Sequence, residues 1–187
     1  MEARNGRFAL LDELLSYHAA DGRERLMVAR MRTFLAGNEA CFERALPSGH
    51  VTGSAWIVDP GATATVLTHH RKLDRWLQPG GHADGDSNVR RVALREACEE
   101  SGLHTLVPAR QAIYDIDVHE IPQHGSEPAH VHYDVRFAFY AQRSERPLAS
   151  AESHHVQWIP LTEIERFGID DSVRRLVAKS SRLVSRT

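Results

Sequence analysis

The sequence Arg95-Glu96-Ala97-Cys98-Glu99-Glu100-Ser101-Gly102-Leu103, with Gly80-Gly81 shortly before it, is the most informative stretch of this chain. Its three glutamates occupy positions i, i+3 and i+4, which form one face of an α-helix because each residue turns the helix by about 100°. Carboxylates this close repel one another unless a cation lies between them. Oxygen ligands with this much charge suit a hard divalent cation such as Mg²⁺. The stretch therefore predicts a helix that carries a metal site.

The same face of this helix also carries Val89, Val92 and Leu103, so the carboxylates interrupt an inward apolar stripe. Buried or half-buried carboxylates are costly unless they are paired or bind a metal ion. We expect Arg95 to pair with Glu99 at i, i+4 and to hold it in position. The alternative is a solvated acidic face, which would place the glutamates opposite the valines.

The expected helix spans about residues 87–101. Asp86 or Ser87 can cap its first amides, and Gly102 suits the left-handed residue that ends a helix. Upstream, Gly80-Gly81 lets a backbone carbonyl approach a cation or a phosphate without obstruction by a side chain. A loop that leads into a helix N-terminus is also a natural site for an anion.

From Gly81 to Leu103 the sequence resembles the Nudix box. That pattern is Gly, five residues, Glu, seven residues, and then Arg-Glu-apolar-any-Glu-Glu-any-Gly-apolar. The first box Glu falls on Ser87 here, and Asp86, one position earlier, is the candidate to supply its carboxylate. The resemblance covers roughly residues 50–170.

The resemblance implies an α/β (α+β) fold, a Nudix-like α/β/α sandwich with a mixed central sheet, preceded by an N-terminal helical segment. We expect residues 1–45 to be a helical extension packed on the domain and residues 46–187 to form the Nudix hydrolase domain. The other predicted elements are two N-terminal helices separated at Asp21-Gly22, a hairpin of 54–58 with 63–69, strands at 112–121, 130–141 and 156–159, a short helix capped by Thr162, and a C-terminal helix capped by Asp170 or Asp171.

The resemblance also implies hydrolysis of a diphosphate (pyrophosphate) linkage in a small molecule of the nucleoside diphosphate-X type. Carried over to this sequence, Glu96, Glu99 and Glu100 bind Mg²⁺ or Mn²⁺, and the Gly80 carbonyl completes the shell. Arg95 orients a glutamate and, with Glu99 and Glu100, forms the catalytic set. The chemistry agrees, because divalent ions neutralise a diphosphate and lower the pKa of a bound water.

Two of the predicted strands, 112–121 and 130–141, alternate apolar residues with histidine, aspartate and arginine. The polar face is either a solvated sheet face or the lining of the substrate cleft, where histidine can ligate metal, bind phosphate or act as a base. On the second interpretation the substrate-binding residues are His82, His119, His130, His132 and Arg136. The general base stays unassigned among Glu120, Glu127, Glu152 and a box glutamate.

The composition restricts the class of protein. The chain has 187 residues, 42% hydrophobic and 26% charged, with a formal charge of −2, so it lacks the basic excess of a protein that binds nucleic acid polymers. No apolar run reaches the roughly 18 residues needed to cross a membrane. The only cysteines, Cys41 and Cys98, form no disulfide framework, which favours a cytoplasmic location. The expected partner is a small-molecule diphosphate, and the resemblance is compatible with a homodimer.

Two other functions fit parts of this pattern. A catalytically weak or inactive Nudix-fold module that binds or senses a ligand would tolerate Ser87 in the box, but it would not need three intact glutamates. An isoprenoid diphosphate isomerase shares the fold, but its chemistry needs a cysteine in the cleft. Cys98 lies on the helix face away from the glutamates and Cys41 precedes the sheet, which disfavours the isomerase.

Overall fold

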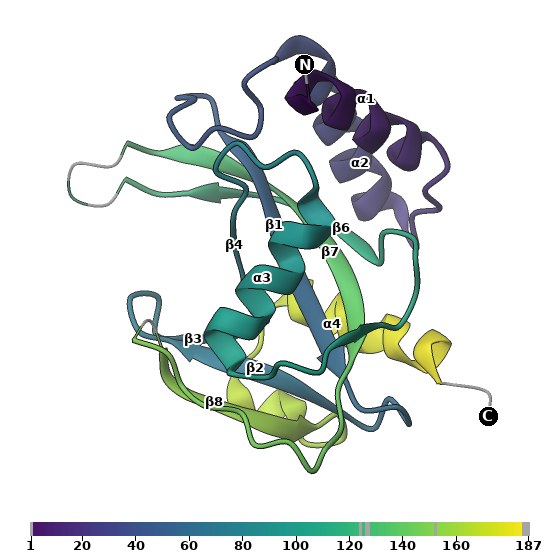
Figure 1. The fold of residues 1–187 in the computed structure, drawn as a ribbon, viewed down its shortest axis with the longest axis vertical. Coiled ribbons are helices and arrows are strands. Elements are labelled where there is room, and N and C mark those ends of the chain that lie inside the picture. The colour runs from purple at the N-terminus through teal and green to yellow at the C-terminus, as the bar shows by residue number, and fades with distance from the viewer. Residues whose placement is uncertain (1, 124, 126–127, 152, 185–187) are drawn as a thin grey trace.

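The computed structural model describes residues 2–123, 125, 128–151 and 153–184. Helices lie on both faces of a curled, mixed sheet (Figure 1). Helix α3 (Val89–Ser101) crosses one face of the sheet and helix α4 (Asp171–Lys179) the other. This arrangement confirms the predicted α/β/α sandwich with a mixed sheet and an N-terminal helical segment. Within the described part of the chain, every helix is too short or too polar to cross a bilayer.

The N-terminal segment forms two helices, α1 (Glu2–Leu15) and α2 (Gly22–Gly37), which lie side by side (Figure 1). The helices separate at Asp21-Gly22 as predicted, and the Asp21 side chain caps α2 by accepting a hydrogen bond from the Glu24 amide at 2.8 Å. The pair packs on the sheet, where Phe34 stacks on Tyr133 with ring centroids 3.8 Å apart. The helical segment and the sheet therefore share one hydrophobic core.

The sheet is built around a parallel pair of strands, β1 and β7, and every other pair in it is antiparallel among the described residues. The main path runs β3-β2-β1-β7-β5, while β4 pairs with β1, β6 with β7 and β8 with β2. The elements are β1 (His50–Val58), β2 (Ala64–His70), β3 (Arg75–Leu77), β4 (Gly80–His82), β5 (Val107–Pro108), β6 (Asp115–Ile121), β7 (His130–Tyr140), β8 (Ser153–Pro160), and the 3-10 helices η1 (Ile164–Phe167) and η2 (Ser180–Leu183).

Strands β1 and β7 pair from His50↔His132 to Val58↔Tyr140, and their side chains alternate between the two faces. Odd-numbered residues of β7, such as Tyr133 and Val135, belong to the core that also contains residues of α3. Even-numbered residues at the far end of both strands join a second core with α4. The predicted alternation along β7 is confirmed, and it leaves the histidines on the face opposite α3.

Local capping agrees with the sequence in two places and differs in two. Gly102 has φ 68° and ends α3, and Asp170 caps α4. The predicted cap of α3 is wrong, because Asn88 accepts the hydrogen bond from the Arg91 amide at 3.1 Å. Asp86 is engaged instead by the Asn88 amide and by the Arg91 guanidinium. The predicted cap at Thr162 is also wrong, since Glu163 precedes η1 and no side chain caps it.

Candidate functional site

The glutamates of α3 lie against the two glycines of β4. A Cβ atom on Gly81 would come within 2.4 Å of Glu96 Oε2, so the Glu96 carboxylate fits only because residue 81 has no side chain. The Gly80 amide donates to Glu100 Oε2 at 3.4 Å. Glu99 is exposed between these two positions on the helix. The structure therefore brings two of the three predicted metal-binding glutamates, Glu96 and Glu100, to the predicted glycine bend.

Arg95 joins the helix to the same strand. Its guanidinium donates to Glu96 Oε1 at 2.7 Å and to the His82 carbonyl at 3.0 Å. The hydrogen bond to Glu96 is the main reason that the pKa of Arg95 is raised above its usual value. The predicted pair of Arg95 with Glu99 is wrong: Glu96 is held on Gly81 beside the His82 carbonyl, so one guanidinium reaches both acceptors. Arg95 thus positions Glu96 and leaves Glu99 exposed.

The ligand chemistry of this group fits a hard divalent cation. Carboxylate oxygens from Glu96, Glu99 and Glu100, together with the Gly80 carbonyl, are the donors that Mg²⁺ and Mn²⁺ prefer. The close approach of Glu96 to Gly81 supports this fit, since it leaves a carboxylate against the glycine backbone without an intervening side chain. The group can bind a divalent ion and, through it, a phosphate.

Ser87 occupies the place where the box pattern has a glutamate. A Cβ atom on Gly6 of α1 would come within 2.2 Å of Ser87 Oγ, so the first helix packs directly on this position. Asp86, the candidate substitute, forms two hydrogen bonds of 2.8 Å with the Arg91 guanidinium on the outer side of the helix. The space for a longer side chain at residue 87 is therefore filled by the N-terminal segment.

Five histidine rings from four strands meet on the face of the sheet opposite α3; we call them the histidine cluster. The ring centroid of His50 lies 4.9 Å from that of His82, 5.0 Å from that of His130 and 4.9 Å from that of His132. His119 adds a ring 5.5 Å from His132. Sequence reasoning identified four of these residues and missed His50. The signal was the alternation of polar residues at His50, Thr52 and Ser54, but their parallel pairing with β7 is not readable from the sequence.

Burial sets the charge of the cluster. Removal from water is the largest reason that the pKa of His50 falls to about 4, and the nearby rings of His82 and His130 lower it further. Burial likewise lowers the pKa of His132 to about 2, assisted by His119 and its other neighbours. At neutral pH both imidazoles are therefore uncharged, and each keeps a lone pair on one ring nitrogen.

The histidine cluster and the glutamates lie on opposite faces of β4. Gly81 pairs with Gly53 and faces α3, whereas His82 pairs with Thr52 and faces the other way. A β-strand turns successive side chains to opposite faces, which separates the two groups by the thickness of one strand. The structure thus gathers the histidines with one another and does not bring them onto the same surface as the glutamates.

Arg136 is far from an open surface. Its side chain is 2% exposed, and its guanidinium contacts Asp134 at 2.7 Å, Asp115 at 3.3 Å and Asp117 at 3.4 Å. These residues, with Arg175, Lys179 and Glu24, form a buried aspartate–arginine network beneath α4. Burial alone would raise the pKa of Asp115, but the hydrogen bond from Arg175 and the nearby cations hold it below its usual value. The structure gives Arg136 buried carboxylates as partners.

The candidates for the general base outside the box helix are only partly described by the structure. Glu120 is exposed on β6, while Glu127 and Glu152 fall outside the described residues.

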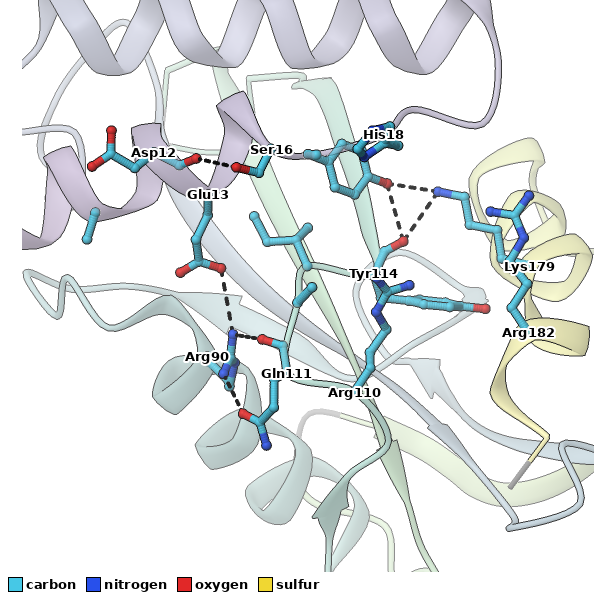
Figure 2. A pocket seen from close by; sticks show the side chains of 14 residues that line it. Asp12, Glu13, Ser16, His18, Arg90, Arg110, Gln111, Tyr114, Lys179 and Arg182 are labelled. Carbon is cyan, nitrogen blue, oxygen red and sulfur yellow. Dashed lines mark hydrogen bonds and ion pairs between the residues drawn. The ribbon is translucent and has the colours of Figure 1, made fainter. Parts of the chain in front are cut away.

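A pocket of about 780 Å³ lies between the N-terminal segment and the domain (Figure 2). Its wall includes Arg90, which contacts Glu13 at 3.6 Å and Gln111 at 3.1 Å, and Lys179, which contacts Tyr17 at 3.0 Å. None of the box glutamates or clustered histidines lines it. These polar groups already bind one another, so we interpret the pocket as a crevice where α1 and the domain meet.

One family model and several solved structures are similar to this chain. The family model described as NUDIX domain matches residues 48–179. The MutT protein from Methanosarcina mazei Go1 is 19% identical, covers 74% of this chain and 96% of its own, and superposes with a TM-score of 0.56. Escherichia coli dihydroneopterin triphosphate pyrophosphohydrolase is 15% identical over 69% of this chain and 92% of its own, with a TM-score of 0.53. A Caenorhabditis elegans Ap4A hydrolase is 15% identical over 72% and 96%, with a TM-score of 0.52. A search of curated proteins gives no match.

Proposed function

The chain belongs to the Nudix hydrolase family, whose domain model spans residues 48–179, and we propose that it hydrolyses the diphosphate linkage of a nucleoside diphosphate derivative. The proposed reaction depends on Mg²⁺ or Mn²⁺ held by Glu96, Glu99 and Glu100. When bound, such an ion neutralises phosphate charge and lowers the pKa of a water that attacks phosphorus. The observation that carries the proposal is the contact of Glu96 and Glu100 with the two glycines of β4.

Each residue of the proposed site has a distinct task. Arg95 fixes Glu96 against Gly81, so one carboxylate is pre-positioned before any ligand binds. Glu99 is exposed, which leaves it accessible to an incoming ion and to the substrate phosphates. Glu100 follows Glu99 on the helix, and its carboxylate accepts a hydrogen bond from the Gly80 amide. A fixed carboxylate beside an accessible one suits a site that binds its metal together with a diphosphate.

The proposed substrate is defined by its chemical class, a diphosphate joined to another group. The structurally similar proteins act, by their names, on Ap4A or dihydroneopterin triphosphate, and at 15% identity they share the fold with this chain. We propose a small-molecule diphosphate as the partner. Cys41 and Cys98 are free thiols, which is consistent with the proposed cytoplasmic location.

The test is turnover of a substrate panel with product identification. Nucleoside diphosphate sugars, dinucleoside polyphosphates, NADH, coenzyme A and nucleoside triphosphates are incubated with Mg²⁺ or Mn²⁺, and the products are identified by mass. We expect cleavage between two phosphates in at least one class, and loss of about 100-fold or more in turnover for Glu99→Gln with Glu100→Gln.

The matched control is Glu165→Gln, the same chemical change at an exposed glutamate that contacts Arg174 on the surface. It should keep wild-type turnover. Unfolding curves of all variants show whether the chain is folded. A folded chain that binds a nucleoside diphosphate but turns over no member of the panel would refute hydrolysis and support a ligand-binding module. Full turnover in the double variant would refute the metal assignment.

A further inference from the structure

His50 is a buried polar side chain without a hydrogen-bond partner. It begins β1, is 1% exposed, and neither Nδ1 nor Nε2 of its ring has a hydrogen-bond partner among the described residues. Leaving a buried polar group unsatisfied is costly, so native proteins usually complete such a group with an ordered water, a ligand or an ion. His50 therefore points to a ligand that the protein atoms do not supply.

The tautomer of His130 is set by the backbone. Its Nδ1 lies 2.9 Å from the carbonyl oxygen of Pro128, which can only accept a hydrogen bond. Nδ1 must then carry a proton, and in the neutral ring Nε2 keeps the lone pair. A carbonyl that fixes one ring nitrogen in this way is the usual outer support of a histidine that ligates a metal through the other nitrogen.

That lone pair points to His132. The two Nε2 atoms lie 3.1 Å apart, and the ligand nitrogens of His50, His130 and His132 all lie within 4.8 Å of one another. In a tetrahedral zinc site with Zn–N of about 2.0–2.1 Å, ligand nitrogens lie about 3.3–3.4 Å apart. The 3.1 Å pair is close to that spacing, and His50 must approach the other two rings to complete it. A proton shared between His130 and His132 would satisfy those two rings, but it would leave His50 without a partner.

We propose that His50, His130 and His132 form a second metal site, for Zn²⁺ or a similar borderline transition metal. Three imidazole ligands without a carboxylate favour such an ion over Mg²⁺, which prefers oxygen ligands. The site is separate from the glutamate group, which lies on the other face of β4. His82 is the neighbour for a fourth position, since its ring centroid lies 4.9 Å from that of His50 and 5.2 Å from that of His132.

The surroundings of the cluster support a built site. His119 Nδ1 lies 2.9 Å from Asp117 Oδ2, so a carboxylate orients this outer ring too. Asp117 is in turn held by Arg175 at 2.9 Å, which ties the cluster to the network beneath α4. The three proposed ligands come from two paired strands, β1 and β7, with His50 directly opposite His132. Ligands on paired strands are held more rigidly than ligands on loops.

The test measures metal binding without reference to activity. Tag-free chain is stripped with a chelator and titrated with Zn²⁺ against a chromophoric competitor in excess Mg²⁺. To remove the glutamate group, the titration uses the Glu96→Gln, Glu99→Gln, Glu100→Gln variant as well. We expect about one equivalent of Zn²⁺ in both proteins, and nitrogen ligands at about 2.0–2.1 Å by X-ray absorption. Failure of turnover in the same variant concerns the proposed hydrolysis and leaves this result untouched.

The ligand assignment is tested with His50→Leu and His132→Gln, with His155→Leu as the matched control at an exposed histidine of β8. Each ligand variant should weaken Zn²⁺ binding by about 100-fold or more, and the control should not change it. If one ligand variant fails to fold, the other variant and the X-ray absorption spectrum of the native site still decide. Absence of Zn²⁺ uptake by the triple glutamine variant, or undiminished uptake by folded His50→Leu or His132→Gln, would overturn the proposal.

Discussion

Strand β7 carries two buried polar regions on one face, and they differ in how their groups are satisfied. The histidine cluster gathers at its start around His130 and His132, while the aspartate–arginine network follows at Asp134 and Arg136. In the network every charge meets an opposite charge, whereas in the cluster His50 lies among other imidazole rings and has no hydrogen-bond partner among the described residues. Buried charges with partners become costly only when one partner is removed, and a buried polar group without a partner calls for a further one, such as a water, a ligand or an ion.

The strongest way to break the network is Asp115→Ala. Asp115 contacts Arg175 at 2.8 Å, Lys179 at 2.6 Å and Arg136 at 3.3 Å. Its removal leaves three cations close together in a buried place, which costs about 3–5 kcal/mol in the free energy of unfolding. Urea denaturation of wild type and variant measures the difference. A change below about 1 kcal/mol would mean that the network does not stabilise the fold.

In the metal-free protein the histidine cluster and the aspartate–arginine network should lose their contributions to stability in different pH ranges. The pKa of His50 is about 4 in the fold against a usual 6.5, so the unfolded chain takes up the proton first as pH falls. Stability from neutral His50 is therefore complete above about pH 6.5 and decreases towards pH 4, by about 3 kcal/mol. Network carboxylates such as Asp115 have lowered pKa values, so their contribution is lost only as pH falls below 3.8.

Urea midpoints measured from pH 7.5 to pH 3.5 check this order. His50→Leu should reduce the slope between pH 6.5 and pH 4, since one of the groups responsible for it is gone. A slope identical to that of the wild type would assign the acid sensitivity to other groups.

His50→Leu should stabilise the metal-free protein, in contrast to the loss expected at the network. Leucine removes two ring nitrogens that have no hydrogen-bond partner among the described residues, and the relief is about 1 kcal/mol. Thermal unfolding in chelator measures the stability of the metal-free proteins, and thermal unfolding in Zn²⁺ measures how much the metal stabilises each of them. The wild type should gain stability from Zn²⁺ and the variant should not. Destabilisation of the metal-free variant would show that His50 packs as a structural residue.

The smallest effect is expected for the exposed ion pair of Glu165 with Arg174. The atoms lie 2.9 Å apart, but the two side chains are 63% and 46% exposed. Solvent screens such a pair, so Glu165→Gln should change the free energy of unfolding much less than Asp115→Ala does. This measurement by urea denaturation gives the exposed reference for Asp115→Ala. A loss as large as that of Asp115→Ala would remove the distinction between buried and exposed pairs.

Much of the glutamate site could be predicted from the sequence because its residues are local. Glu96, Glu99 and Glu100 share one helix, and helical periodicity alone places them on one face next to Val92. Gly80-Gly81 could be identified as a bend open to a cation or a phosphate, and the structure adds that Gly81 leaves room for the Glu96 carboxylate. The ion-pair partner of Arg95 could not be predicted from the sequence, because it depends on where the His82 carbonyl lies in space.

The sequence by itself determined the helix of carboxylates, its glycine end, the alternation along β7 and the family, because all of these follow from short-range spacing. Only the tertiary structure decided that β1 runs parallel beside β7, which brings His50 opposite His132. It also decided that the histidines face away from the glutamates and that Arg136 is enclosed by three aspartates. The physical reason is that strand pairing joins residues about 80 positions apart, and no local pattern encodes the register of such a pair.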